Sequence, residues 1–169
     1  MPFSVLVVDD EPGLLLSLER LLMAHDYRVA VATSGAQALE QLTSVRHDIL
    51  LLNLMLPGVE EAAILDRVIA RRLDLAVIAI GDTASVNEAI AALRQGAVDF
   101  LGKPFDPEEL LGSLANAARK LELERSNRLV CARSEASERL HRFVVHRSPN
   151  LIFILDAEGH FSYLNRRVE

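Results

Sequence analysis

The sequence predicts an α/β fold in which a five-stranded parallel, doubly wound sheet is followed by a long α-helix and a partial β-hairpin. Three observations support this prediction. Short apolar runs alternate five times with amphipathic segments over about the first 115 residues, which is the pattern of repeated strand–helix units. The run Ile49–Leu52 is unbroken, as in strands that are buried on both faces. Neither proline nor glycine interrupts residues 113–148, a stretch longer than an ordinary terminal helix.

Each strand–helix unit carries its own local signals. Strands are expected at residues 3–8, 27–31, 48–53, 75–80 and 98–101, and helices at 12–25, 33–42, 60–72, 85–95 and from 107 onward. Pro12 suits a first helical turn, Ser34 is the expected N-cap of the second helix, and Gly96 is placed to end the fourth. Leu56-Pro57-Gly58 predicts a turn. The short connections imply right-handed crossovers, with helices on both faces of the sheet.

Polar residues follow these strands at the ends where a doubly wound sheet binds its ligands. The set comprises Asp9, Asp10 and Glu11 after the first strand, Asn53 after the third, Gly81, Asp82 and Thr83 after the fourth, and Lys103 and Pro104 after the fifth. Any one of them is equally expected in a solvated loop. Because the carboxyl ends of parallel strands lie at one edge, their joint occurrence predicts a polar pocket there.

Three segments carry a resemblance to a known family: Val5-Leu6-Val7-Val8-Asp9-Asp10-Glu11, the stretch from Asp48 through Asn53 to Gly58, and the stretch from Gly96 through Lys103 to Phe105. In their order and spacing, residues 1–118 resemble a response-regulator receiver domain with a CheY-like, flavodoxin-like fold. The resemblance implies that Asp9 and Asp10 are the acid pair that holds Mg²⁺. It also implies that position 53 accepts the phosphoryl group, that position 81 carries the switch hydroxyl, and that Lys103 precedes a cis-proline, Pro104.

Two of these positions depart from the family's pattern. An acyl phosphate needs a carboxylate nucleophile, whereas Asn53 offers an uncharged amide. The site thereby loses one of the anionic oxygens that Mg²⁺ prefers, so we expect no required cofactor and only weak Mg²⁺ binding at Asp9 and Asp10. Gly81 lacks the switch hydroxyl. We therefore expect a degenerate receiver, or pseudo-receiver, with no catalytic residue.

Other charged residues bear on this hypothesis. Asp82 is the acid that a displaced phosphorylation site would use, whereas Asp48 precedes its strand and is expected at the opposite end. Lys103 loses its usual carboxylate partner at position 53, and Asp9 or Asp10 is expected to replace it. If the Lys103 ammonium is mostly solvated, replacing it with alanine should cost within about 1 kcal/mol of stability.

Residues 119–148 are expected to form a helical coiled-coil linker. Leu129, Ala136, Leu140 and Phe143 recur along this segment at helical spacing, together with Ala132. A stripe of this kind favours packing against a second helix in a parallel homodimer. The alternative is a single amphipathic helix that folds back on the receiver.

Residues 149–169 predict a β-hairpin. Two strand-like segments, 151–155 and 161–165, flank the turn residues 156–159. The segment resembles the opening of a PAS sensor domain, and a PAS domain needs several times this length to close its sheet. The chain is thus expected to be the front end of a longer protein, whose output is a histidine kinase or a cyclic-dinucleotide enzyme.

Composition excludes several classes of function. Residues 1–118 carry a charge of −9 and residues 119–169 a charge of +3, but the basic residues of the second part alternate with acids. With no tryptophan and few aromatic residues, the chain is not expected to bind nucleic acid. A single cysteine, Cys131, excludes a disulfide framework. No apolar run spans a membrane and no leader pattern is visible, so a cytoplasmic location is expected.

The sequence thus favours a non-enzymatic regulatory module of a two-component system. It is expected to signal by protein contacts through the linker, with a histidine kinase or another signalling protein as its partner. One alternative is a genuine phosphorelay receiver that a histidine kinase phosphorylates at a non-standard site. Another is a small α/β phosphatase or hydrolase with Asp9 as nucleophile, although neither a second catalytic base nor a glycine-rich phosphate loop is visible.

Overall fold

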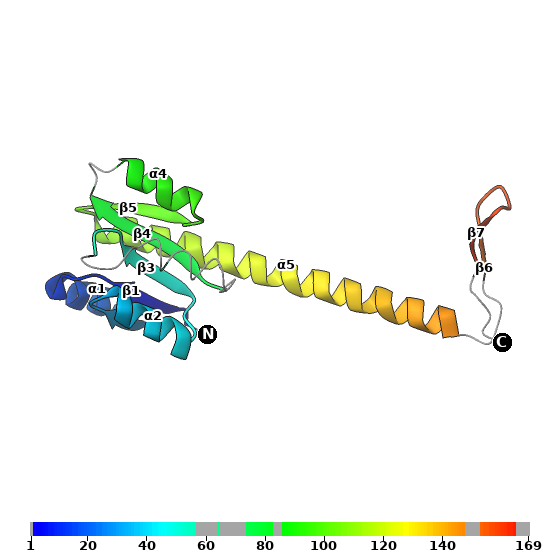
Figure 1. Cartoon of the computed structure of the whole chain (residues 1–169), viewed down its shortest axis with the longest axis horizontal. Coiled ribbons are helices and arrows are strands. Elements are labelled where there is room, and N and C mark those ends of the chain that lie inside the picture. Colours follow the sequence, from blue (N-terminus) through cyan, green and yellow to red (C-terminus); the bar gives the residue numbers. More distant parts are fainter. Residues whose placement is uncertain (1, 57–63, 65–73, 83–85, 148–152, 165–169) are drawn as a thin grey trace. The chain divides into compact units, whose positions relative to one another are not determined.

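The computed structural model describes residues 2–56, 64, 74–82, 86–147 and 153–164 (Figure 1). Its elements are β1 (Ser4–Val8), α1 (Pro12–Ala24), β2 (Arg28–Ala32), α2 (Gly35–Ser44), β3 (Ile49–Asn53), β4 (Ala76–Asp82), α4 (Val86–Arg94), β5 (Asp99–Lys103), α5 (Pro107–Arg147), β6 (Phe153–Leu155) and β7 (Phe161–Leu164). The helix expected at 60–72 lies outside the described residues except for Ile64, which is helical and buried. Pro57 and Gly58 of the expected turn also lie outside them.

The first five strands form one parallel sheet in the order β2-β1-β3-β4-β5. This is the doubly wound, flavodoxin-like order, and the direction of winding reverses between β1 and β3. Both of these central strands are buried along their whole length, which explains their unbroken apolar sequences. The predicted fold class is therefore confirmed, and the reversal point places the ends of β1 and β3 side by side.

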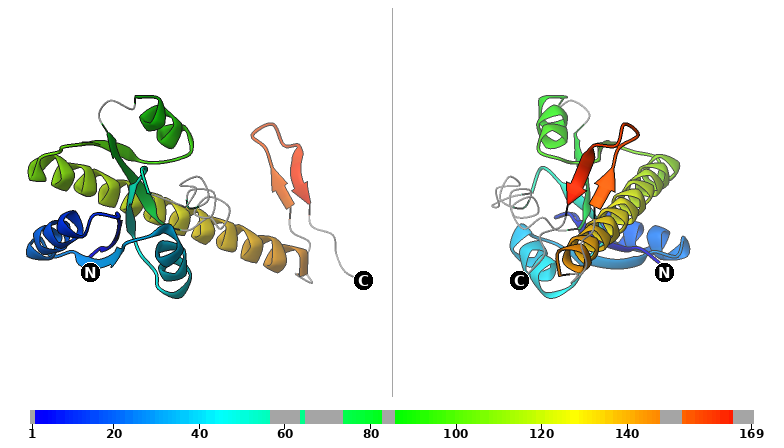
Figure 2. Two further views of the ribbon diagram at one scale, coloured as in Figure 1. Left: turned by 60° about the vertical axis from the view of Figure 1, so that its left-hand side comes forward. Right: turned by 90° about the vertical axis from the view of Figure 1, so that its right-hand side faces the viewer.

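Two hydrophobic clusters hold the sheet between its helices. On one face, Leu18 of α1 and Leu114 of α5 pack with Val7 and Ile78 of the sheet. On the other face, Leu42 of α2 and Ala92 of α4 pack with other strand residues. The right-hand view in Figure 2 shows these two pairs of helices on opposite sides of the sheet. Burial of each leucine in such a cluster contributes about 1.5–3 kcal/mol before the cost of ordering the chain.

The local signals in the sequence correspond to observed features. Pro12 begins α1, and the hydroxyl of Ser34 accepts a hydrogen bond from the backbone N–H of Gln37 at 3.3 Å, which caps α2. Gly96 follows α4 with a φ of 100°, a left-handed conformation that glycine adopts without strain. The ends of α2 and α4 are thus set by residues that the sequence identifies.

Backbone contacts divide the chain into two compact units, Met1–Leu123 and Glu124–Glu169. Leu121 of α5 is buried in the core of the first unit. None of the described helices is long and apolar enough to cross a membrane.

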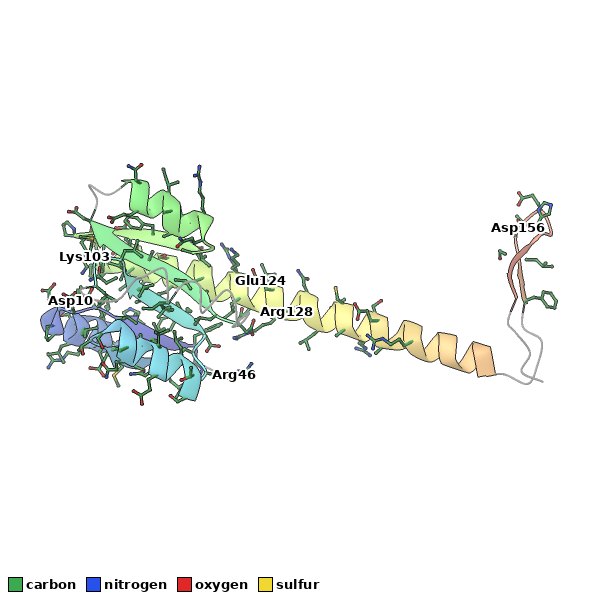
Figure 3. The ribbon with its side chains drawn as sticks, in the orientation of Figure 1. Asp10, Arg46, Lys103, Glu124, Arg128 and Asp156 are labelled. Atoms are coloured by element: carbon green, nitrogen blue, oxygen red, sulfur yellow. The ribbon has the colours of Figure 1, made fainter. Side chains whose placement is uncertain are left out.

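The second unit contains the end of α5 and an antiparallel hairpin of β6 and β7. A carboxylate oxygen of Asp156 accepts backbone hydrogen bonds from Glu158 at 3.1 Å and from His160 at 2.7 Å, which closes the turn. Gly159 occupies a left-handed conformation with a φ of 88°. The expected hairpin is therefore present at this turn, and Asp156 is labelled in Figure 3.

A buried histidine lies at the amino-terminal edge of the sheet. His47 is 8% exposed, and its Nδ1 lies 3.2 Å from the hydroxyl of Ser4. Among the described residues its Nε2 is buried without a hydrogen-bond partner. Burial lowers the pKa of His47 below its ordinary value of 6.5; the charge of Asp48 opposes this effect and that of Arg28 adds to it.

This environment makes stability depend on pH. Because the pKa is lower in the folded state than in the unfolded state, the contribution of neutral His47 is complete above pH 6.5 and is lost as the pH falls from 6.5 through the folded pKa. We expect the urea concentration at the unfolding midpoint to decrease when the pH is lowered from 7.5 to 5.5. The decrease should be smaller in His47→Gln. His160→Gln, which removes an exposed ring, is the control. An unchanged slope in His47→Gln would contradict the assignment.

Candidate functional site

The carboxyl ends of the central strands meet around an open cleft of about 680 Å³. The side chains that line it come from segments far apart in the sequence, and Figure 3 shows Asp10 and Lys103 at this same edge. The complete lining is Asp10, Glu11, Leu14, Asn53, Met55, Gly81, Asp82, Lys103, Pro104 and Phe105. Most of the predicted strand-end residues are therefore gathered at one site. Asp48 lies at the opposite edge, where it accepts the backbone N–H of Ser4 at 2.8 Å.

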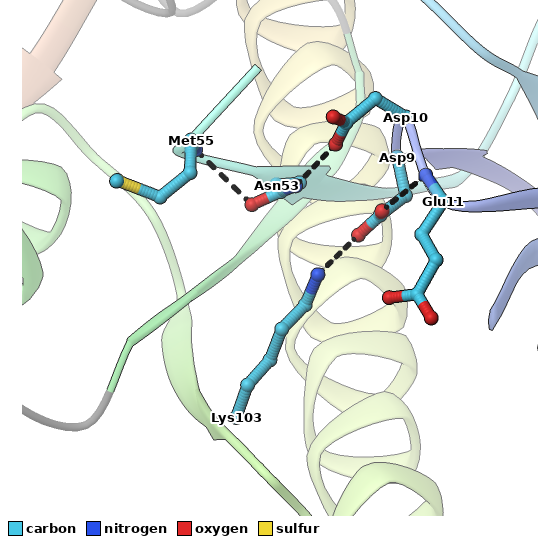
Figure 4. A network of polar contacts seen from close by, with 6 residues as sticks. All are labelled: Asp9, Asp10, Glu11, Asn53, Met55 and Lys103. Carbon is cyan, nitrogen blue, oxygen red and sulfur yellow. Dashed lines mark hydrogen bonds and ion pairs between the residues drawn. The ribbon is translucent and has the colours of Figure 1, made fainter. Parts of the chain in front are cut away.

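An ion pair crosses the floor of the site. The ammonium of Lys103 donates to Oδ2 of Asp9 at 2.7 Å (Figure 4). The Asp9 side chain is only 1% exposed and that of Lys103 is 30% exposed. The second carboxylate oxygen of Asp9 accepts the backbone N–H of Glu11 at 2.9 Å. The expectation of a replacement partner for Lys103 is met by Asp9, and its ammonium is not mostly solvated.

Asn53 is buried at the end of β3, with 3% of its surface exposed. Its side-chain NH₂ donates to a carboxylate oxygen of Asp10 at 3.2 Å, and its Oδ1 accepts the backbone N–H of Met55 at 3.0 Å (Figure 4). An aspartate here could accept from Met55, but when ionised it could donate nothing to Asp10. The amide thus removes the like-charge contact that two carboxylates would make at this position.

Gly81 contributes backbone alone to the wall of the cleft. A Cβ added at this position would lie 3.1 Å from Cε2 and 3.3 Å from Cζ of Phe100, and 4.0 Å from Cβ of Leu54. The first two distances are shorter than ordinary van der Waals contact between carbon atoms. The space that a side chain at position 81 would need is therefore occupied by an aromatic ring.

The remaining lining residues differ in how far the sequence identifies them. The peptide bond between Lys103 and Pro104 is cis, as the resemblance implies for Pro104. Leu14, Met55 and Phe105 form apolar walls that the strand-end argument does not include. Met55 and Phe105 lie within the segments that carry the family resemblance, close to Asn53 and Pro104, and this position is the sequence signal for them. Thr83, next to Asp82, lies outside the described residues.

The four linker residues lie in α5. Leu129 is 72% exposed, and Ala136 is also exposed within the described chain. Leu140 and Phe143 belong to the helix, but their side chains are outside the part that the structure describes. These four residues are on a different unit from the cleft.

Comparison with known proteins identifies the family to which this fold and this cleft belong. A family described as the response regulator receiver domain matches residues 5–115. This chain belongs to that family. Membership accounts for the gathering of acids and a lysine at the strand ends.

Relatives of known sequence and structure agree with this assignment. Response regulator MprA of Mycobacterium ulcerans (strain Agy99) is 36% identical over 124 residues, which cover 73% of this chain and 53% of the relative. A receiver domain from Clostridium thermocellum has a TM-score of 0.67 at 26% identity, and covers 72% of this chain and 98% of its own. NtrX from Brucella abortus has a TM-score of 0.72 at 26% identity, covering 77% of this chain and 30% of its own. The chain spans about half the length of the MprA relatives that it matches.

The family implies a bound Mg²⁺, and the donor set here fits that ion poorly. Asp9 is committed to Lys103 and to the N–H of Glu11, and Asp10 faces the NH₂ group of Asn53. An amide NH₂ repels a cation where an oxygen ligand would attract it. Within the described ranges, no group of three or more His, Cys, Asp or Glu side chains is arranged to hold a metal ion.

Proposed function

We propose that this chain is a regulatory module whose receiver signals by protein contacts without accepting a phosphoryl group. The proposal rests on Asn53 at the end of β3, whose side-chain NH₂ and side-chain oxygen each take part in a hydrogen bond. A neutral amide cannot form the acyl phosphate on which a receiver's switch depends. Membership in the receiver family supports a role in two-component signalling.

The contacts of the cleft support this proposal. Lys103 is paired with Asp9 at 2.7 Å, so the charge of this cation is compensated within the chain. Apart from Lys103, the charged residues that line the described cleft are all acidic, namely Asp10, Glu11 and Asp82. Mg²⁺ binding at Asp9 and Asp10 is weak at most in this proposal, and no cofactor is required.

We assign three regions to the module. Residues 1–118 are the pseudo-receiver, residues 119–148 a coiled-coil linker and residues 149–169 the opening of a PAS domain. The 72% exposure of Leu129, which belongs to the proposed apolar stripe, supports a helix that pairs with another helix. The protein is proposed to be cytoplasmic and non-enzymatic, to bind a histidine kinase or another signalling protein, and to bind no nucleic acid.

The linker proposal predicts a homodimer at tens of micromolar concentration. Light scattering of the full chain should give the mass of a dimer, and acetyl phosphate with Mg²⁺ should leave that mass unchanged. Leu129→Glu with Leu140→Glu should give monomers, because both charges would enter the apolar seam. The matched control, Asn127→Glu with Ser134→Glu, adds the same charges on the opposite face of the helix and should remain dimeric. A monomeric natural chain contradicts the linker, and a mass that responds to acetyl phosphate contradicts the phosphate-independent receiver.

A genuine phosphorelay receiver with a non-standard site is the second candidate. Asp82 favours it, since its carboxylate lines the same cleft as Lys103. In that case acetyl phosphate would place a hydroxylamine-sensitive label on Asp82, and Asp82→Asn would abolish it. Peptide mapping after labelling separates the two candidates.

A further inference from the structure

A single polar side chain is buried within the described helices, and it belongs to α5. Ser113 is 4% exposed, whereas the other buried polar residues of the described chain lie in strands or loops. Its neighbours at helical spacing, Leu110, Leu114 and Ala117, are apolar and completely buried. A hydroxyl among them loses its water and needs a partner inside the protein. Because alanine would fill most of the same space without that cost, the partner of Ser113 indicates what the hydroxyl does.

The partner is Asp99, the first residue of β5. The hydroxyl of Ser113 donates to Oδ2 of Asp99 at 2.6 Å, a length typical of a hydroxyl that donates to an ionised carboxylate. The other carboxylate oxygen of Asp99 accepts the backbone N–H of Phe100 at 2.9 Å. The carboxylate is therefore bound to its own strand through one oxygen and to α5 through the other.

This contact differs from those that other helix hydroxyls make. Ser17 donates to the carbonyl oxygen of Gly13 and Ser44 donates to that of Glu40, each four residues earlier in the same helix. Such bonds do not fix where a helix lies on a sheet. The bond of Ser113 joins a helix to a strand, and it is directional, whereas the apolar contacts around it are not. It would therefore break if α5 turned about its axis.

We propose that the hydrogen bond between Ser113 and Asp99 fixes the rotation of α5 on the sheet, so that Ser113 is a positioning residue. α5 is one helix from Pro107 to Arg147, and a turn of a helix about its axis carries all of its residues together. The bond therefore also limits rotation at the start of the linker. The inference goes beyond the proposed function and does not depend on phosphoryl chemistry at Asn53.

The experiment measures the distance between spin labels on α1 and α5 by double electron–electron resonance. The labels are attached at Arg20→Cys and Lys120→Cys, two exposed positions of the first unit, in a full chain that carries Cys131→Ser. Excess unlabelled chain ensures that only labels on the same chain are compared. A turn of about 20° moves a label about 10 Å from the helix axis by about 3 Å. We expect one narrow distance distribution in this background.

Ser113→Ala should broaden the distribution by about 3 Å or add a second distance, because α5 can then turn. The matched control is Ser17→Ala, which removes a hydroxyl that bonds only within its own helix and should leave the distribution narrow. An unchanged distribution in Ser113→Ala overturns the proposal. Equal broadening in Ser17→Ala overturns it as well, because the effect would then not belong to the contact with Asp99.

Variants of Asp99 separate the hydrogen bond from the volume of the serine side chain. Asp99→Ala removes the acceptor and should broaden the distribution as much as Ser113→Ala does. The double variant should be no broader than either single variant, because one bond is lost in all three. Asp99→Asn keeps an oxygen that can accept the hydroxyl and should stay narrow. If Ser113→Ala does not fold, the two Asp99 variants decide the matter, and equal distributions in Asp99→Ala and Asp99→Asn overturn the proposal.

Discussion

Replacing Lys103 with alanine is expected to destabilise the chain by about 3 kcal/mol, the lower end of the cost of breaking a buried ion pair. Asp9 is almost fully buried, and without Lys103 its carboxylate would keep the hydrogen bond from the backbone N–H of Glu11 but lose its cation. The partial exposure of Lys103 admits some water to the site and keeps the expected loss at this lower end. Urea denaturation at pH 7 measures the loss as a fall in midpoint at constant slope.

Two further variants separate the effect of losing the ion pair from the effect of losing a lysine side chain. Lys120→Ala removes an exposed lysine from α5 and should change stability by less than about 0.5 kcal/mol. Asp9→Asn with Lys103→Met removes both charges and should recover part of the loss, because no unpaired buried carboxylate remains. A loss below about 1 kcal/mol in Lys103→Ala would show that Asp9 does not need this cation.

Asn53→Asp is expected to destabilise the chain in the absence of divalent ions and to create a Mg²⁺ site. The amide nitrogen is 3.2 Å from a carboxylate oxygen of Asp10, so the substitution replaces a hydrogen bond with a like-charge contact. Two such charges about 4 Å apart repel by about 4 kcal/mol at an effective dielectric of 20, and the exposure of Asp10 reduces this to about 2 kcal/mol. Mg²⁺ would relieve that repulsion, because three carboxylates would then face it.

Thermal unfolding in EDTA and in millimolar Mg²⁺ measures both effects. The natural chain should unfold at nearly the same temperature in the two buffers, whereas Asn53→Asp should regain most of its lost stability with Mg²⁺. Asn53→Ala also removes the amide but adds no charge, so it should lose stability without any recovery. Equal responses of Asn53→Asp and the natural chain to Mg²⁺ would contradict the role assigned to position 53.

The sequence was sufficient to predict the sheet and the edge of the sheet at which the site lies. Apolar runs such as Ile49–Leu52 are typical of buried strands, and parallel strands bring their carboxyl ends to one edge, so the sequence places Asn53 and Lys103 at the same edge. Strand ends were less predictable: β4 extends through Asp82, beyond the apolar run that ends at Ile80. Backbone pairing with β5 decides that limit, and a strand's own sequence does not contain its partner's register.

The contacts and burial of individual side chains within the site could not be predicted from the sequence. Asp9 and Asp10 are adjacent in the sequence, yet one is buried against Lys103 and the other is exposed and faces Asn53. The two side chains point in different directions after β1. Because both residues are aspartate, the residue type does not indicate which of them is buried. The sequence also did not indicate that Phe100 lies beside Gly81, because it does not show which side chain fills the space next to a glycine.

Treatment with acetyl phosphate and Mg²⁺, followed by intact-mass measurement, tests most directly whether Asn53 removes phosphoryl chemistry from this receiver. The natural chain is predicted to keep its unmodified mass, while Asn53→Asp treated in parallel gains one phosphoryl group that hydroxylamine removes. The variant shows that the rest of the cleft remains competent, so that the amide alone explains the difference. A stoichiometric, hydroxylamine-sensitive phosphoryl group on the natural chain, mapped to Asp9, Asp10 or Asp82, would contradict the account.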